Sequence, residues 1–392
     1  MRIREDYEKI EDEILAAYAM KSKDSSGRAV DNKAHPYRTC YQRDRDRIVH
    51  SQAFRKLEYK TQVFVILEGD YYRTRLTHTI EVAQIARTIG RALRLNEDLI
   101  EAIALAHDLG HPPFGHAGEE ALSKIMQEGI KEAFNHNLRS FEIVNKFEKR
   151  YPDFDGLDLS REVLIGILKH NTNYDIPTEL KGFDDGPTLE ARVVDIADAL
   201  AYLSHDIDDG LTSGLITKVD LMDSKLWQDS YGKIEASVDP TNNEMMKYQV
   251  VKFLIDLQTR DLLEFSSQRL KEESFNSSRE VRDYHSSRSV KNVIDFSPRM
   301  KQERNELQEL LHEKLYRHYR VIRMTEKAKR IVTEIFKVYE EKPEQLPYNV
   351  WPRDKSFDKK QKYYIICNYI AGMTDRAALD EHEKLFNPFK KV

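Results

Sequence analysis

The amino-acid sequence predicts a mostly α-helical protein with a few short β-strands. Two observations support this fold class. Glycine and proline, which end or kink helices, number only 15 and 12 among the 392 residues. Long stretches also repeat apolar residues at the three- and four-residue spacing of a buried helix face. The sequence contains no internal repeat and no glycine-rich phosphate loop of the P-loop or Rossmann type, so other groups would have to hold the phosphates of any bound nucleotide.

Residues 1–60 predict an N-terminal helical segment. A charged helix is expected at 5–20, a polar loop at 21–40 and a second helix at 44–60. The apolar run Val63–Leu67 then leads into a Gly-Asp turn, which favours a short strand or hairpin.

Helical periodicity dominates residues 61–215, which we expect to form the core that carries the functional site. The helices predicted here are 76–94, 97–109, 116–128, 137–150, 160–170 and 188–209. Residues 216–392 predict an additional C-terminal helical region, with a polar stretch at 222–243 and a short strand around Val290–Phe296 inside the loop-rich stretch 275–300. Its predicted helices are 244–272, 300–318, 325–341, 357–374 and 375–386.

Composition excludes several classes of protein. The chain has 62 Lys and Arg against 67 Asp and Glu, a formal charge of -5, so it is not a strongly basic nucleic-acid coat, although a local basic pocket is allowed. The longest apolar runs are about five residues, too short for a membrane helix. The N-terminus has no apolar signal segment, and the two cysteines, Cys40 and Cys367, lie far apart. We therefore expect a cytoplasmic protein without a disulfide framework or a cysteine-based zinc finger.

Two histidines sit at the ends of apolar helix stripes. His78 lies four residues before Val82 on the apolar face of the helix predicted at 76–94, and therefore points inward. His107 ends a similar stripe in the next helix and is followed directly by Asp108. A third helix carries Asp198 on a polar stripe with Asp195, Tyr202 and Asp206.

Imidazoles and carboxylates from three helices can converge on one divalent metal ion. Two histidine nitrogens and two carboxylates suit Mg²⁺, Mn²⁺ or Fe²⁺, and also Zn²⁺. Four protein ligands on a six-coordinate ion leave positions for water and a substrate oxygen. A lone His-Asp pair occurs by chance in many chains, and a single inward histidine is more often a hydrogen-bonded core residue. The combined spacing of all four residues favours a metal site.

The loop that follows His107 is rich in histidine and closes in a tight turn. Three histidines lie within 107–116, where two prolines and a glycine restrict the backbone. His116 begins a new predicted helix, and Glu119 follows three residues later on the same face. A histidine paired with a carboxylate is typical of a general acid or base. Glu119 is equally explained as an acid favoured at a helix N-terminus by the helix dipole.

These motifs resemble a known family. His78, His107-Asp108 and Asp198 match the H…HD…D signature of the HD-domain phosphohydrolases. Further runs are similar to the bacterial deoxynucleoside triphosphate triphosphohydrolases of the dGTPase family, with the human SAM-and-HD-domain dNTPase as a more distant relative. These runs are 45–51, 54–64, 73–78, 106–116, 135–137, 166–170, 194–202 and 369–376. The resemblance covers about residues 30–215 and returns at 369–376.

The resemblance implies an HD-domain helical core and the reaction dNTP + H₂O → deoxynucleoside + triphosphate, with dGTP and other dNTPs as substrates. It places His78, His107, Asp108 and Asp198 as metal ligands and His116 with Glu119 as the catalytic dyad. The implied substrate contacts are Arg75, His111 and His136 near the phosphates, Gln62 and Asp206 at the sugar 3′-hydroxyl, and Tyr202 beside both. Asn368 departs from the family pattern, in which an acidic residue precedes the Tyr-Ile-Ala-Gly run.

The family also implies a homo-oligomer, with a hexamer favoured, a C-terminal region that completes the substrate pocket and the oligomer contacts, and regulation by a dNTP effector or single-stranded DNA. No membrane association is expected. Two alternatives stay open: another HD phosphohydrolase, such as a nucleotide phosphatase or phosphodiesterase, and a nucleotide- or nucleic-acid-binding regulator on an HD scaffold.

Several residues near the motifs allow two interpretations. Each of His50, Lys169 and His170 lines the site or lies on a helix surface. Arg45 and Arg47 form a solvated face or a subunit interface. Asp195 orients a metal ligand or is simply an exposed acid. His116 is either a general acid or a general base.

Overall fold

The computed structural model describes residues 1–31, 33–62, 73–171, 178, 180–286 and 292–391. Its described residues are predominantly helical, as predicted, but the expected short β-strands are absent from them. Two isolated bridges, Thr61 with Thr74 and Lys149 with Gly156, are the only β-type pairings there. The described part of the chain is therefore all-helical, and the prediction of a few short strands was wrong.

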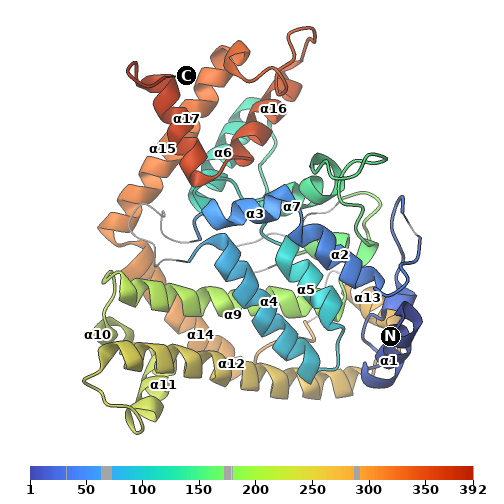
Figure 1. Ribbon diagram of the computed structural model, residues 1–392. Coiled ribbons are helices and arrows are strands. Elements are labelled where there is room, and N and C mark those ends of the chain that lie inside the picture. Colours follow the sequence, from blue (N-terminus) through green and yellow to red (C-terminus); the bar gives the residue numbers. More distant parts are fainter. Residues whose placement is uncertain (32, 63–72, 172–177, 179, 287–291, 392) are drawn as a thin grey trace.

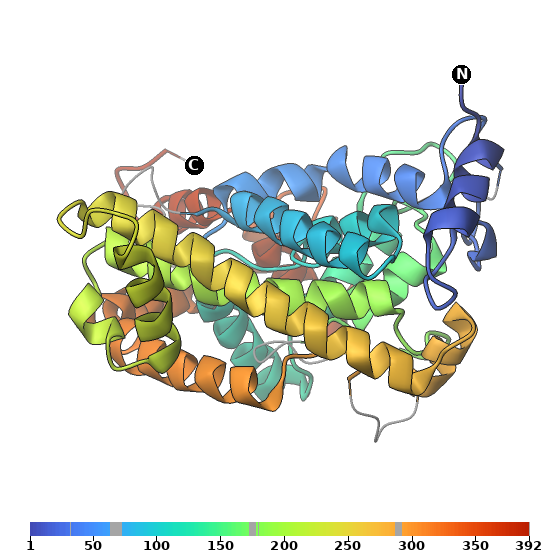
Figure 2. The ribbon, with the colours of Figure 1, turned by 90° about the horizontal axis from the view of Figure 1, so that it is seen from below.

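A layer of long helices forms the main body (Figure 1). It contains α4 (Arg75–Ala92), α5 (Glu97–Ala106) and α9 (Leu189–Thr212), with α2 (Cys40–Val49) packed on α5. The 31-residue helix α12 (Asn243–Glu273) runs along the opposite side of α9, as Figure 2 shows from below. Because α9 is packed between these elements, much of its length is buried, and this holds Asp198 inside the protein.

A second group of helices extends away from this body (Figure 1). Here α6 (Gly115–Ile130) packs against α15 (Tyr319–Glu341) and α16 (Lys359–Ala371), and α17 (Asp375–Phe386) packs on α15. These helices share an apolar core of their own, distinct from that of the main body. Since α6 follows the His-rich loop directly, the C-terminal helices brace the end of the candidate site.

Several predicted helices are shorter or divided. The first helix, α1 (Arg4–Ile14), ends early, and the helix expected at 44–60 breaks at Ser51, whose side chain caps a new short helix by accepting a bond from the Phe54 backbone N–H. The helix expected at 137–150 passes into a π-helical turn at Ile143–Phe147. The remaining helical elements are η1 (Ser22–Asp24), α3 (Gln52–Lys56), η2 (Leu57–Tyr59), α7 (His136–Glu142), α8 (Arg161–Leu168), α10 (Lys218–Leu221), α11 (Lys225–Glu235), α13 (Ser278–Ser286), α14 (Pro298–Leu311), the π-helical turn η5 (His312–Tyr316) and η6 (Pro343–Gln345).

The two predicted strands have different outcomes. Val63–Leu67 lies outside the described residues. The described part of Val290–Phe296 is an irregular segment whose apolar side chains, including Val293 and Ile294, are buried in the main core. The Asp295 backbone N–H and C=O bond with the Ser266 hydroxyl instead of a neighbouring strand. The apolar character of this segment therefore indicates burial rather than strand pairing.

Among the described helices, none combines the length and the apolar character needed to cross a lipid bilayer.

Candidate active site

The four predicted metal ligands meet in the main body. His78 lies in the first turn of α4, His107 caps the C-terminus of α5 with Asp108 next to it, and Asp198 lies in the middle of α9. All four are buried, with exposed fractions between 1% and 7%. His78 Nε2 lies 2.8 Å from Asp198 Oδ1, and His107 Nε2 lies 3.8 Å from the same oxygen and 3.5 Å from Asp108 Oδ1. The structure thus assembles the set that the sequence pattern proposed.

The donor atoms fit a divalent cation. His107 Nδ1 donates to the Ala104 carbonyl at 2.6 Å, which leaves the lone pair of its ring on Nε2. That buried Nε2 has no hydrogen-bond partner within the described part of the chain, although it faces two carboxylates. A buried polar atom without a partner is unfavourable unless a ligand satisfies it. A metal ion at this position would do so.

Electrostatics keep the cluster in a ligand-competent state. Burial alone would raise the pKa of Asp198, but hydrogen bonds from His170 and His78 hold it below its usual value. The pKa of Asp108 is also held well below its usual range, because His107 and Arg75 outweigh the effect of burial. Burial lowers the pKa of His107, while the neighbouring carboxylates of Asp108 and Asp198 act in the opposite direction. Ionised carboxylates and neutral imidazoles are the forms that bind metals.

His170, which the sequence left open, belongs to the site. It is 1% exposed, and its Nε2 lies 3.3 Å from Asp198 Oδ2. Its Nδ1 donates to Asp195 at 2.8 Å, and Asp195 also pairs with Arg192 at 2.9 Å. Asp195 is therefore a buried partner that orients His170, not an exposed acid. Donor atoms of His107, His170 and Asp198 lie within 4.8 Å of one another, so His170 is a further candidate ligand.

A chain of polar contacts behind His78 was missed at the sequence level. His78 Nδ1 lies 3.1 Å from His205 Nδ1, and His205 Nε2 lies 2.5 Å from a Glu81 carboxylate oxygen. Arg73 pairs with the other oxygen of Glu81 at 3.2 Å. The contacts fix the ring of His78 with Nε2 toward the candidate ion, as second partners of metal-binding histidines do. Two spacings in the sequence could have predicted these contacts. Glu81 follows His78 by three residues, and His205 follows Asp198 by two helical turns.

Arg75 provides positive charge beside the cluster. Its Nη1 pairs with Asp108 Oδ2 at 2.8 Å, while Nε and Nη2 have no hydrogen-bond partner within the described residues. Gly115 lies close by with a φ of +57°, and a Cβ added there would come within 2.9 Å of Arg75 Nη2. Glycine at this position therefore allows both the left-handed backbone and the close approach of the guanidinium.

The predicted dyad is joined by a third residue. His116 Nδ1 lies 3.7 Å from Glu119 Oε2, whereas His136 Nδ1 lies only 2.9 Å from the same oxygen. The backbone N–H of His136 also donates to Glu119, and the ring of His136 stacks on His111 at 3.9 Å. Burial would raise the pKa of Glu119, but His136 and His116 lower it strongly, so its carboxylate is ionised. Glu119 thus holds a group of histidines rather than His116 alone.

The predicted sugar-contacting residues lie around these two clusters. The Tyr202 ring lies 6.3 Å from the ring of His78 and 6.4 Å from that of His116, between the metal cluster and the dyad. Asp206 is buried and accepts a bond from the Tyr316 hydroxyl, so the C-terminal region reaches the site. Burial, with neighbouring Asp209, raises the pKa of Asp206 well above its usual value. Gln62 is also buried, and its Oε1 has no partner in the described part of the chain.

Two predicted basic residues make contacts within the chain. Arg45 pairs with Asp98 and Glu101, each at 3.2 Å. Arg47 is 8% exposed and donates to the carbonyls of Leu157 and Asp158 at 2.7 Å. Neither forms an open basic face in this chain.

His50 and Lys169 make backbone contacts outside the cluster. His50 caps the C-terminus of α2 and is exposed, and its carbonyl accepts a bond from Arg150. The Lys169 amine lies 3.4 Å from the carbonyl of Asp184.

Asn368, which departs from the family pattern, contacts Arg139. Its side-chain oxygen accepts a bond from Arg139 at 2.6 Å, and its carbonyl accepts a second at 3.2 Å. An acid at this position would give Arg139 a charged partner in the same place.

The fold and the site together define a class. A buried His/Asp cluster carried by three core helices is the architecture of an HD domain, and residues 75–203 match the HD domain family model. Residues 294–384 match the model of the phosphohydrolase-associated domain.

Comparison with curated proteins narrows this class. The chain is 47% identical over 381 residues to a deoxyguanosinetriphosphate triphosphohydrolase-like protein of Geobacter sulfurreducens, covering 96% of each chain. Proteins with the same description from Geobacter metallireducens (96% of each chain) and Ralstonia nicotianae (95% of this chain, 94% of that protein) are each 45% identical. The chain belongs to this family of deoxyguanosinetriphosphate triphosphohydrolase-like HD proteins, which confirms the resemblance found in the sequence.

Proposed function

We propose that the protein is a metal-dependent enzyme that hydrolyses deoxynucleoside triphosphates to a deoxynucleoside and inorganic triphosphate. The observation that carries this proposal is the placement of two groups side by side. A buried His/Asp cluster fit for one divalent cation adjoins a histidine-carboxylate group, and Arg75 contacts the first while Tyr202 lies between the two.

The metal cluster would consist of His78, His107, Asp108 and Asp198. A divalent cation bound there supplies Lewis-acid chemistry, which polarises the α-phosphate and lowers the pKa of water. We propose Mg²⁺, Mn²⁺ or Fe²⁺, with Zn²⁺ also compatible, because mixed nitrogen and carboxylate ligands discriminate weakly among these ions.

The residues outside the cluster would perform three tasks. Arg75, His111 and His136 lie where they can bind the triphosphate; Arg75 supplies a permanent positive charge, as oxyanion stabilisation requires. In the reaction, the oxygen of water joins the α-phosphorus and the bond from that phosphorus to O5′ breaks. The alkoxide leaving group needs a proton, and we propose that His116 donates it or, in the opposite assignment, accepts a proton from water. Glu119 orients the histidines around it.

The sugar would be recognised by Gln62, Tyr202 and Asp206. Hydrogen bonds from polar groups can hold the 3′-hydroxyl, while close packing at C2′ rejects an added hydroxyl. This supports a preference for deoxyribonucleotides, including dGTP.

A chromatographic product assay tests the proposal. The purified protein is incubated with each dNTP and NTP in the presence of Mg²⁺, Mn²⁺ or Fe²⁺. The proposal expects deoxynucleoside and triphosphate in equal amounts. Phosphate or pyrophosphate as the first product would instead indicate another HD phosphohydrolase. No turnover with any nucleotide and metal would favour a binding regulator on an HD scaffold.

We also propose a cytoplasmic homo-oligomer, with a hexamer favoured, that a dNTP effector or single-stranded DNA can modulate. The family membership supports this part of the proposal. Sedimentation of the protein with and without each dNTP measures the assembly state directly.

A further inference from the structure

The corner between α16 and α17 leads into a buried acid that reaches the His-rich loop. Asp375 is the first residue of α17 and is 4% exposed. The helix is capped by Thr374, whose hydroxyl accepts the Ala377 backbone N–H at 3.2 Å, so Asp375 is not needed as a cap. Asp375 belongs to the motif 369–376, to which the proposed function assigns no role. Its carboxylate is therefore available for contacts outside its own helix.

Three donors from two distant segments bind this carboxylate. The Phe114 backbone N–H donates to Oδ1 at 2.8 Å. The Thr61 backbone N–H donates to Oδ2 at 2.9 Å, and the Thr61 hydroxyl donates to the same oxygen. Burial raises the pKa of Asp375, while these three bonds act in the opposite direction. Because a carboxylate accepts on both oxygens, it satisfies all three donors at this junction.

Phe114 depends on such a partner because its backbone conformation is unfavourable. It is the N-cap of α6 with a φ of +65°, and Gly115 continues the left-handed turn with a φ of +57°. This conformation is rare for a bulky residue and persists only where surrounding contacts stabilise it. The Phe114 side chain is buried in the apolar core of the C-terminal helices, while Asp375 holds its backbone N–H. Both contacts fix the turn that places His116 in the first turn of α6.

The other side of the junction contacts the segment that holds Arg75. Thr61 follows Lys60, whose carbonyl accepts the Arg75 backbone N–H at 3.0 Å. The Lys60 amine also donates to the His111 carbonyl. Asp375 therefore joins the segment that contacts Arg75 to the turn at the start of α6.

We propose that Asp375 is a positioning residue, which holds the turn at Phe114 so that the His116 ring stays within reach of phosphates bound by Arg75. The inference rests on the proposed function, because it assigns His116 a part in the reaction. Asp375 acts through the backbone N–H groups of Phe114 and Thr61 and not by contact with the substrate. A shift of about 1 Å in a reacting group can cost roughly 10²-fold in rate, so a looser turn should lower kcat.

Asp375→Asn tests the proposal in the full-length protein. The amide keeps one acceptor oxygen, but its NH₂ group then faces the backbone N–H of either Phe114 or Thr61, so at least one bond is lost. We expect kcat for dGTP to fall roughly 10- to 100-fold, with KM nearly unchanged.

Glu381→Gln is the matched control for this variant. Glu381 is an acid on the same helix, and it accepts bonds from the hydroxyls of Tyr339 and Tyr369 within the C-terminal helices. An amide oxygen can still accept both bonds, so this variant should keep the wild-type kcat.

A double-mutant cycle separates positioning from a general loss of structure. In the His116→Ala background, Asp375→Asn should lower kcat by less than about twofold, because a ring that is absent cannot be misplaced. An equal loss in both backgrounds would overturn the proposal, as would a wild-type kcat in Asp375→Asn. Failure of the wild type to release triphosphate from any dNTP would refute the proposed function itself, so the two failures are distinguishable.

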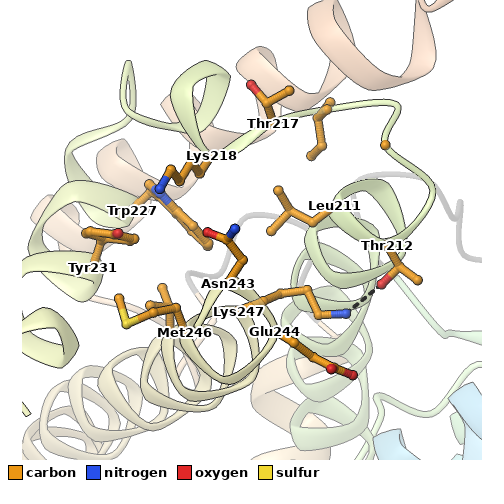
Figure 3. Close-up of a pocket in the computed structure, with 13 residues that line it drawn as sticks. Leu211, Thr212, Thr217, Lys218, Trp227, Tyr231, Asn243, Glu244, Met246 and Lys247 are labelled. Carbon is orange, nitrogen blue, oxygen red and sulfur yellow. Dashed lines mark hydrogen bonds between the residues drawn. The ribbon is translucent and has the colours of Figure 1, made fainter. Parts of the chain in front are cut away.

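Thr61→Val provides the same test if Asp375→Asn does not fold. Valine has nearly the shape of threonine and removes only the hydroxyl donor, so kcat should fall roughly threefold, and only where His116 is present. Thr212→Val is its control, because the Thr212 hydroxyl accepts a bond from Lys247 at 2.6 Å at the C-terminal end of α9 (Figure 3). The control should keep the wild-type kcat, and an unchanged kcat in Thr61→Val would overturn the proposal.

Hydrogen exchange adds a measurement that does not depend on turnover. Pro112 and Pro113 carry no amide hydrogen, so a peptide that begins at residue 112 reports the amides from Phe114 onward. The Phe114 amide should exchange roughly tenfold faster in Asp375→Asn than in the wild type or Glu381→Gln, because it loses a bond to a charged acceptor. Equal protection in all three proteins would overturn the proposal.

Discussion

Replacement of His116 by alanine should slow catalysis strongly while leaving the fold intact. His116 lies at the start of α6 with a side chain 39% exposed, whereas the side chains of Glu119 and His136 are 17% and 3% exposed. Surface substitutions of this kind usually change the free energy of unfolding by no more than about 0.5 kcal/mol. Metal and substrate binding should also persist, because the His116 ring is not a member of the metal cluster.

The expected loss is in kcat. Removal of a general acid or base lowers rates roughly 10²–10⁴-fold, which corresponds to about 2.7–5.4 kcal/mol in the activation free energy. Glu119→Gln should cost less, because the carboxylate lies 3.7 Å from His116 and 2.9 Å from His136 and therefore acts by orienting both rings. The rate of triphosphate release from dGTP, measured by chromatography, gives the kcat of both variants.

An analogue with an acidic leaving group decides the role of His116. Such a group departs without a proton, so the defect of His116→Ala should shrink toward wild-type rates if His116 donates the proton to O5′. Equal slowing of dGTP and the activated analogue would refute that reasoning, and His116 would then be a general base or a structural residue. A variant that retained the full kcat with dGTP would exclude both catalytic roles.

Four further predictions follow from the site and its surroundings. Asp198→Ala should lose the bound metal and its turnover but keep its helical circular dichroism; full activity after metal depletion would contradict the assignment. The kcat/KM for dGTP should exceed that for GTP, and comparable values would argue against the role of Tyr202 at the sugar. Burial lowers the pKa of His285 to about 4, from the ordinary value of 6.5, so the unfolded chain binds more protons between these values. Stability should therefore fall as the pH drops through this window, by up to about 1.4 kcal/mol per pH unit from this residue, and His285→Gln should flatten the slope in urea titrations. Asn368→Asp should raise the free energy of unfolding by roughly 1 kcal/mol, and with it the melting temperature, because Arg139 gains a charged acceptor in place of a neutral one. A lower melting temperature would show that burying the new charge costs more than the pair gains.

The sequence predicted that His78, His107, Asp108 and Asp198 would meet, because these residues end or continue regular helix stripes; that they bind a metal stays a proposal. His78 and His107 each extend an apolar face, so their inward direction follows from periodicity alone. Residues such as His170 and Asp195 could not be assigned in this way. Asp195 lies on the expected stripe, but its partner comes from the end of another helix 25 residues away, and no local pattern encodes that distance.

The β-strand prediction failed for a related reason. A short run of apolar residues such as Val293 and Ile294 is equally compatible with a strand and with an irregular segment held against a core. The deciding contact is the hydroxyl of Ser266 on α12, which satisfies the backbone of Asp295. The contact of Tyr316 with Asp206 could not be predicted either, since this hydrogen bond joins residues 110 positions apart.

Hydrolysis in ¹⁸O-labelled water tests the central claim most directly. If water joins the α-phosphorus and the bond to O5′ breaks, mass spectrometry should find one ¹⁸O atom in the released triphosphate and none in the deoxynucleoside. Label in the 5′-hydroxyl of the deoxynucleoside would place the attack at carbon. Label in orthophosphate or pyrophosphate would place it at another phosphorus. Either result would contradict the proposed chemistry.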